Sequence, residues 1–271
     1  MPMKKRVLSL TLCLVFLLSS FGIQAFAATT YTDLIDDILQ RYESADRSAE
    51  SALQQQVNGI YRLVELMVVV ALESNPTDSQ RDLILGVIDD LEANDKRVES
   101  APQQLVNGAY RCAEILAIIA MQYDYAGTYQ DLILDILDTL DRNNSTANDA
   151  PQQAANGLYR CVELLTIIAL ENSSTSSQTS YVQSVYDSLN KYDDTCESAY
   201  QQQVNGAYRC VELLYAISQE LDDTGDYGSV ADSVWDSFKD GDNRTDSAAQ
   251  QLAHGLYRCI DLATVIAYEL S

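Results

Sequence analysis

A pattern of polar residues that could bind a ligand, or pair with one another, recurs five times in this sequence. It begins with Asn, continues with Tyr and Arg, and closes with Glu three residues after the Arg, except that the fifth copy has His254 and Asp261 in place of Asn and Glu. Because positions three and four apart share one face of a helix, the Asn, Arg and Glu side chains should line up with Tyr beside them. The candidate ligand-binding residues of this polar stripe are Asn58, Tyr61, Arg62, Asn107, Tyr110, Arg111, Glu114, Asn156, Tyr159, Arg160, Glu163, Asn205, Tyr208, Arg209, Glu212, His254, Tyr257 and Arg258.

The polar stripe permits two interpretations. In the favoured one, Arg and Glu pair on their own helix, or Arg bridges to the carboxylate of the next copy, and the resulting ladder fixes the register between neighbours. Partly buried ion pairs contribute specificity more surely than stability. In the other, Asn, Arg and Tyr line a groove that holds an extended ligand with one set of contacts per copy, as repeat proteins commonly do.

Cysteine also recurs, at one helical position of four copies, where the first copy has Leu63. An apolar alternative at this position indicates that the thiols pack as small hydrophobic groups. Equivalent positions on packed helices lie about 8–10 Å apart, beyond the ~7 Å Cα separation that a disulfide tolerates. We therefore expect no disulfides. The four recurring residues are Cys112, Cys161, Cys210 and Cys259, while Cys196 falls in a loop.

The residue types in this sequence argue against a metal site and against an active site. A single His in the chain excludes the usual zinc sites. The loop 240–246 opens like a calcium-binding loop, but Arg244 stands at a ligand position and Thr245 replaces the turn glycine. An active site needs different groups at one point, whereas the acids and bases here recur in every copy. We predict no catalytic residue, no metal site and no cofactor.

These residues belong to a repeat that fills the chain after its first 27 residues. Its glycines, Gly59, Gly108, Gly157, Gly206 and Gly255, are spaced 49 residues apart without insertion or deletion. Such a period is typical of stacked helical units. The copies span approximately residues 28–76, 77–125, 126–174, 175–223 and 224–271, and we expect residues 28–271 to form a single repeat domain.

Each copy contains a short and a long helical pattern. In the short pattern of copy three, apolar residues recur at helical spacing, and we expect them to form one buried face. These residues are Leu132, Ile133, Ile136, Leu137 and Leu140. The long pattern covers about 22 residues and has an almost wholly apolar second half. It begins with Ser or Asp three residues before Gln, as in a capping box. These caps are Ser51, Ser100, Asp149, Ser198 and Ser247.

The predicted fold class is all-α: tandem helical hairpins, five copies of 49 residues, stacked as an α-solenoid. The long helices should form the inner layer and the short, acidic helices the outer layer. A closed α/α toroid is the alternative, because periodicity does not distinguish an open stack from a ring. The recurring glycine should mark close helix–helix contact, since it costs about 1 kcal/mol of helix propensity relative to Ala.

The N-terminus predicts export. A basic start at Lys4 to Arg6, an apolar stretch from Val7 to Phe21 and the sequence Ala25-Phe26-Ala27 are typical of a secretory signal peptide spanning residues 1–27 and cleaved after Ala27. The style of these features is bacterial. We therefore expect a secreted protein with no membrane association after cleavage.

The net charge of the chain limits the classes of molecule that it can bind. The net charge of −23 disfavours nucleic acids and anionic membrane surfaces, and 47% hydrophobic residues exclude wholesale disorder. The predicted function is a secreted, non-enzymatic binding or scaffold protein for an unknown extracellular or cell-surface ligand: a peptide, a protein or a glycan. The alternative is an α/α-toroid hydrolase or lyase that acts on an extracellular polymer.

Overall fold

The computed structural model describes residues 30–49, 51–95, 100–146, 149–222, 225, 227–242 and 247–271. Within these ranges the chain forms ten α-helices and no strand, so the all-α prediction is confirmed. The predicted signal peptide lies outside the described residues. The helices are α2 (Tyr31–Ser48), α3 (Ala52–Glu73), α4 (Asp78–Asp95), α5 (Ala101–Tyr123), α6 (Gln130–Thr146), α7 (Ala150–Asn172), α8 (Ser176–Asp193), α9 (Ala199–Leu221), α10 (Gly228–Asp242) and α11 (Ala248–Leu270).

The starts of the long, odd-numbered helices follow the predicted capping pattern. Asp149 accepts a hydrogen bond from the main-chain N–H of Gln152 at 2.9 Å, and Ser198 accepts one from Gln201 at 3.3 Å. Ser51 and Ser247 do the same. Ser100 departs from the pattern, because its hydroxyl donates to the Gln103 side chain instead. Side-chain caps satisfy main-chain donors that the first turn leaves unpaired.

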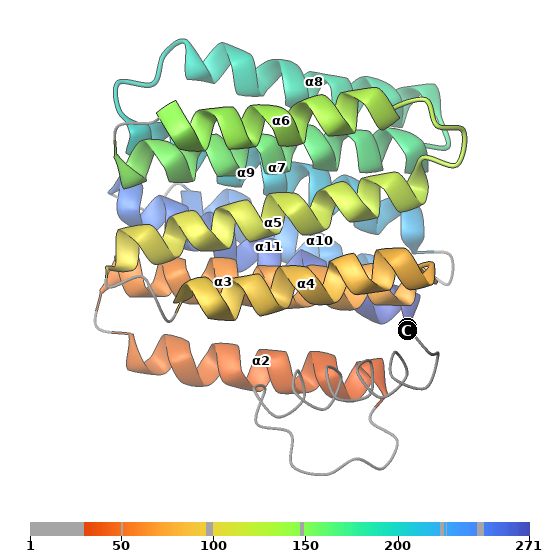
Figure 1. The fold of residues 1–271 in the computed structure, drawn as a ribbon, viewed down its shortest axis with the longest axis horizontal. Coiled ribbons are helices and arrows are strands. Elements are labelled where there is room, and N and C mark those ends of the chain that lie inside the picture. Colours follow the sequence, from red (N-terminus) through yellow and green to blue (C-terminus); the bar gives the residue numbers. More distant parts are fainter. Residues whose placement is uncertain are drawn as a thin grey trace, which may run out of the picture.

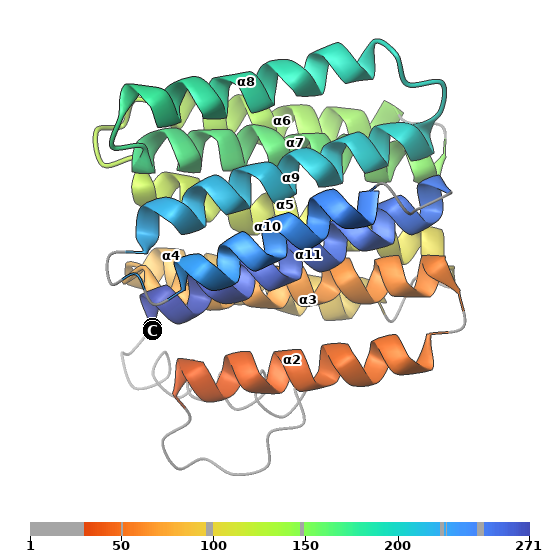
Figure 2. The same cartoon turned by 180° about the vertical axis from the view of Figure 1, so that it is seen from behind.

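Long helices pack against long helices, and each short helix packs across two of them. Along the chain α3 contacts α5, α5 contacts α7, α7 contacts α9 and α9 contacts α11. The short helix α6 packs against α7 and α5, and α8 packs against α9 and α7. Figures 1 and 2 show the short helices covering the outside of the long ones. Neighbouring helices are therefore packed as predicted.

The first and last long helices, α3 and α11, also pack against each other. The side-chain amide of Gln56 on α3 donates to the main-chain carbonyl of Ala249 on α11 at 2.6 Å. Tyr42 of α2 meets the ring of Tyr257 edge-on, with ring centroids 5.1 Å apart. A Cβ placed on Gly59 would lie 3.1 Å from the Cβ of Leu256. The two ends of the repeated region are thus in direct contact.

The recurring glycine has the close-packing role expected for it. A Cβ on Gly157 would lie 2.9 Å from the Cβ of Ala109 on the preceding long helix. On Gly206 the corresponding distance to Leu158 Cβ is 3.0 Å. Real Cβ atoms essentially never come closer than 3.0 Å, and at 3.0 Å the neighbouring side chain would have to shift within a tightly packed interior. Glycine is therefore favoured where consecutive long helices cross, because a side chain would be crowded there.

The short helices bury a narrower face than the sequence pattern predicted. Ile133, Ile136 and Leu140 of α6 are buried, but the side chain of Leu132 is 48% exposed. With 3.6 residues per turn, Leu132 lies about 70° from the centre of the stripe that the other three define. Placing Leu132 on the buried face was wrong. No helix in the described part of the chain is long and apolar enough to span a membrane.

Candidate functional site

The polar stripe faces the short helices that flank each long helix. Arg111 on α5 contacts Asp90 on α4, with Nη1 3.2 Å from Oδ2. The guanidinium of Arg209 on α9 lies over the ring of Tyr192 on α8, 5.5 Å from its centroid. These partners come from the outer layer. The stripe therefore lines the outside of the long-helix layer, in the spaces between neighbouring short helices.

Each Arg of the stripe pairs with an acid three residues later on its own helix. The N–O distances are 2.8 Å for Arg62–Glu65, 2.6 Å for Arg111–Glu114, 3.0 Å for Arg160–Glu163, 2.9 Å for Arg209–Glu212 and 2.9 Å for Arg258–Asp261. Further ionic partners come from the adjacent short helix of the same copy, as Arg41 does for Glu65 at 3.1 Å. The Arg–Glu pairs thus form between groups within one copy.

Contact between copies is made by Asn and Tyr instead. The side-chain amide of Asn107 donates to the Tyr61 hydroxyl of the preceding copy at 3.3 Å and to the Leu91 carbonyl at 3.1 Å. In copy four, Asn205 donates to the Tyr159 hydroxyl at 3.2 Å. These bonds tie α5 and α9 each to the previous long helix and to the end of the short helix before it, whereas at the junction with copy three the buried Tyr110 hydroxyl has no such partner among the described residues. They support a structural ladder, with Asn and Tyr as the groups that join copies.

His254 takes the place of this Asn in copy five and keeps one of its contacts. Its Nε2 lies 3.4 Å from the main-chain carbonyl of Phe238. Phe238 is the counterpart of Leu91 and Leu189 in the repeat. The imidazole therefore occupies the structural role of the amide it replaces.

The remaining stripe residues are also held against the scaffold. The Tyr159 hydroxyl donates to Asp193 at 2.8 Å, and Gln152 donates to the Asn156 side chain at 3.3 Å. The ring of Tyr208 packs edge-on against Phe238, with centroids 4.9 Å apart. Burial raises the pKa of Tyr110 to about 12. Asn58 is half-buried.

Burial dominates the electrostatics of the stripe. It raises the pKa of the acidic partners Glu65, Glu163, Glu212 and Asp261 in spite of the nearby arginines. For Glu114 burial raises the pKa to about 7, with Asp90 and Asp141 adding to the effect of burial and Arg111 opposing it. One such carboxyl group belongs to each long helix and sits beside its own arginine. The acids are therefore distributed around the outer layer.

Part of the hydrogen-bonding capacity of the stripe is unused. The Nε atoms of Arg111, Arg160 and Arg209 are buried, and none donates a hydrogen bond to the protein. A buried donor without an acceptor costs free energy, so each position favours a water molecule or a ligand oxygen. The same is true of Arg258, so the feature recurs in four consecutive copies. The spaces between short helices thus retain a regular set of donors.

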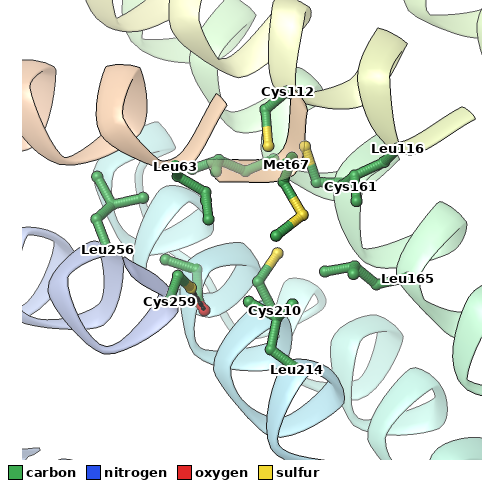
Figure 3. Close-up of a pocket in the computed structure, with 12 residues that line it drawn as sticks. Leu63, Met67, Cys112, Leu116, Cys161, Leu165, Cys210, Leu214, Leu256 and Cys259 are labelled. Atoms are coloured by element: carbon green, nitrogen blue, oxygen red, sulfur yellow. Dashed lines mark hydrogen bonds between the residues drawn. The ribbon is translucent and has the colours of Figure 1, made fainter. Parts of the chain in front are cut away.

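The axis between the long helices is filled by apolar side chains and thiols. Cys112, Cys161 and Cys210 point toward one another with Leu63 and Met67 (Figure 3). They leave a cavity of only about 10 Å³. The thiol of Cys161 donates to the Ala109 carbonyl at 3.7 Å, and burial contributes to the raised pKa of the Cys210 and Cys259 thiols. The described cysteines are free thiols, and those on the axis form part of the core.

A second repeated surface was missed from the sequence. Large apolar side chains are exposed at one equivalent position of four short helices, among mostly polar and acidic residues. We call them the apolar belt: Leu83 (58% exposed), Leu132 (48%), Tyr181 (37%) and Val230 (45%). Its 49-residue spacing was visible in the sequence, but helical periodicity assigned Leu132 to the buried face. Comparison with protein-family models, curated proteins and solved structures finds no match for this chain.

Proposed function

We propose that this protein is a secreted, non-enzymatic binding or scaffold protein that holds its ligand on the outer surface of a closed ring of helical hairpins. Ring closure is the first element of the proposal. It is supported by the packing of α11 against α3 and by the Gln56–Ala249 hydrogen bond between the two ends. An open solenoid keeps its terminal units apart.

The ligand is placed on the outer surface because the interior of the helix ring has no room for it. A cavity of about 10 Å³ on the axis is smaller than any ligand, and it is lined by thiols, Leu and Met. A polymer-cleaving enzyme with a central cleft would need space and unlike polar groups there. The geometry therefore favours binding between and across the short helices.

The apolar belt is the single observation that carries the proposal. Exposed leucines are ordinary one at a time, but exposure at the same repeat position of four short helices repeats an apolar side chain along one band of the outer layer. Exposed carboxylates such as Asp131 and Asp135 surround it on α6. A protein or peptide with apolar and basic side chains complements this band.

A pull-down tests the proposal. The chain from residue 28 would be immobilised and exposed to culture supernatant and cell-envelope proteins, beside a variant carrying Leu83→Ser, Leu132→Ser and Val230→Ser. We expect the variant to keep the helical circular dichroism and thermal midpoint of the parent and to lose the captured protein. A Gln130→Ser/Gln183→Ser variant, altered at exposed neutral positions of α6 and α8, is the control. Equal capture by all three proteins would contradict the proposal.

A further inference from the structure

A hollow of about 320 Å³ lies between α8 and α9, beside the C-terminal end of α7. Its walls include Tyr181, Tyr215, Gln178, Gln219 and Glu220, and most of its lining is apolar. This volume is at the lower end of the range found for small-molecule sites, which combine apolar and aromatic walls with a few polar groups. The hollow therefore has the size and composition of a site for one small chemical group.

The two tyrosines are departures from the repeat. Tyr181 stands where other copies carry aliphatic residues, namely Leu34, Leu83, Leu132 and Val230. Tyr215 stands where other copies carry smaller residues, namely Val68, Ala117, Thr166 and Thr264. Architecture explains residues that every copy shares. It does not explain two aromatic rings that only copy four brings to the same hollow.

Tyr215 is fixed in place before any ligand arrives. Its hydroxyl donates to Asp232 on α10 at 2.6 Å. Its ring stacks on Trp235, with centroids 4.8 Å apart and planes 9° from parallel. A side chain ordered in advance loses little conformational entropy on binding. The wall that Tyr215 contributes is thus preorganised by α10.

The charge of the hollow is negative. Among the described residues that line it, Glu220 is the charged one. One oxygen of Glu220 accepts a long bond from the Ser174 main chain at 3.4 Å, while the other is buried and accepts none. A buried carboxylate oxygen is stabilised by a cationic donor, and the faces of tyrosine rings attract cations. The carboxylate oxygen and the tyrosine rings therefore both favour a cationic ligand.

We infer that the hollow between α8 and α9 binds an alkylammonium group, with Glu220 facing the charge and Tyr181 and Tyr215 packing against the alkyl substituents. The group could belong to a lysine side chain of a peptide or to a free small amine, since the chemistry is shared. This site shares Tyr181 with the apolar belt, but it goes beyond the proposed function because it needs neither Leu83, Leu132 nor Val230. A belt variant that captures no protein should therefore still bind the small amine.

The fluorescence of Trp235 can be used to measure ligand binding in the hollow. Trp235 is the only tryptophan of the chain and stacks on a wall of the hollow, so its fluorescence should report an occupant. The folded protein would be titrated with tetramethylammonium, with choline and with a lysine peptide blocked at both ends. The neutral isostere 3,3-dimethylbutan-1-ol and glucose are the controls. We expect saturable fluorescence changes with at least one cation and none with the neutral compounds.

Two substitutions test the residues. Glu220→Gln should weaken cation binding at least about tenfold, because the charge is lost while the shape is kept. Gln is accommodated at this position in copy two, where Gln122 donates to the Ala71 carbonyl at 3.0 Å. Tyr181→Leu, which restores the residue type of Leu83 and Leu132, should also weaken binding. Glu73→Gln makes the same change at the equivalent position of copy one and should have no effect.

The outcomes separate the possibilities. Saturation by the lysine peptide alone identifies a peptide ligand, and saturation by the small amines alone identifies a free amine; both support the site. Equal responses to choline and its neutral isostere would overturn the inference. So would the absence of any saturable response, or unchanged affinity in the folded Glu220→Gln protein.

Discussion

The side-chain amide of Asn205 on α9 donates to the main-chain carbonyl of Leu189 on α8, 3.0 Å away. The same amide reaches the Tyr159 hydroxyl of the preceding long helix. One residue therefore ties together three helices from two copies. Asn107 makes the equivalent pair of contacts in copy two, so the connection recurs in alternate copies.

Asn205→Ala should lower the free energy of unfolding by about 1–3 kcal/mol, because a buried carbonyl and a tyrosine hydroxyl lose their donor. Urea denaturation followed by circular dichroism measures the change. Gln183→Ala, at an exposed position of the same hairpin, should be nearly neutral. A loss no larger than that of the Gln183 variant would show that the amide does not hold the copies together.

Two glycine-to-alanine substitutions should change the stability of the protein in opposite directions. Gly206→Ala places a Cβ 3.0 Å from the Cβ of Leu158 and should destabilise the protein by about 1–3 kcal/mol. Gly86→Ala, inside α4, meets no atom within 4 Å and should stabilise it by about 0.5–1 kcal/mol through helix propensity. Thermal unfolding of the two variants provides the comparison. Stabilisation by both would contradict close contact between α7 and α9.

Acidification should stabilise the protein through Glu114. Burial raises its pKa from 4.5 to about 7 in the folded state, so folding takes up a proton between these values. Stability from this group is therefore gained as pH falls from about 7 toward 4.5, and lost as pH rises. Glu114→Gln should flatten the dependence of the unfolding free energy on pH in this window.

Glu197→Gln, at an exposed loop position, serves as its control and should keep the slope of the parent. Because the chain is strongly acidic, protonation also relieves general repulsion in every variant. The difference in slope between the two variants isolates Glu114. Identical slopes would argue against a raised pKa for this carboxyl group.

Thiol labelling should distinguish Cys196 from the cysteines of the axis. Cys196 is partly exposed, whereas Cys112, Cys161, Cys210 and Cys259 are buried. We expect the four to react at least about a hundredfold more slowly with a maleimide, at a rate set by unfolding. Mass spectrometry of a labelling time course gives the count. Rapid modification of a second cysteine in the native protein would mean that the axis is open to solvent.

The Arg160–Glu163 pair should be structural. Arg160→Ala leaves a largely buried carboxylate without its partner and should cost about 1–3 kcal/mol of stability. Adding Glu163→Leu should recover part of that loss, which a double-mutant cycle measures. If Arg160→Ala kept full stability but abolished ligand capture in the pull-down, the pair would belong to a binding groove.

Much of the local structure was predictable from the sequence. The caps at Ser51 and Asp149, the crowding at Gly157 and the apolar nature of the Cys112 position follow from helical spacing and residue size. These features depend on neighbours a few residues away or on the next identical unit. Repetition makes such neighbours predictable, because each copy presents the same surface to the next.

Which way each helix face points could be learned only from the tertiary structure. Periodicity placed the polar stripe and Leu132 on helix faces, but the faces that meet the axis, the flanking helices or solvent depend on how the helices pack. The same holds for the contact of Gly59 with Leu256 and for the meeting of Tyr181 and Tyr215 at one hollow, because these residues lie 197 and 34 positions apart. The sequence determined the repeating unit and its packing signals. Only the packed chain decided that the thiols face inward, that the stripe joins the outer helices, and that exposed apolar residues form a band among mostly polar and acidic residues.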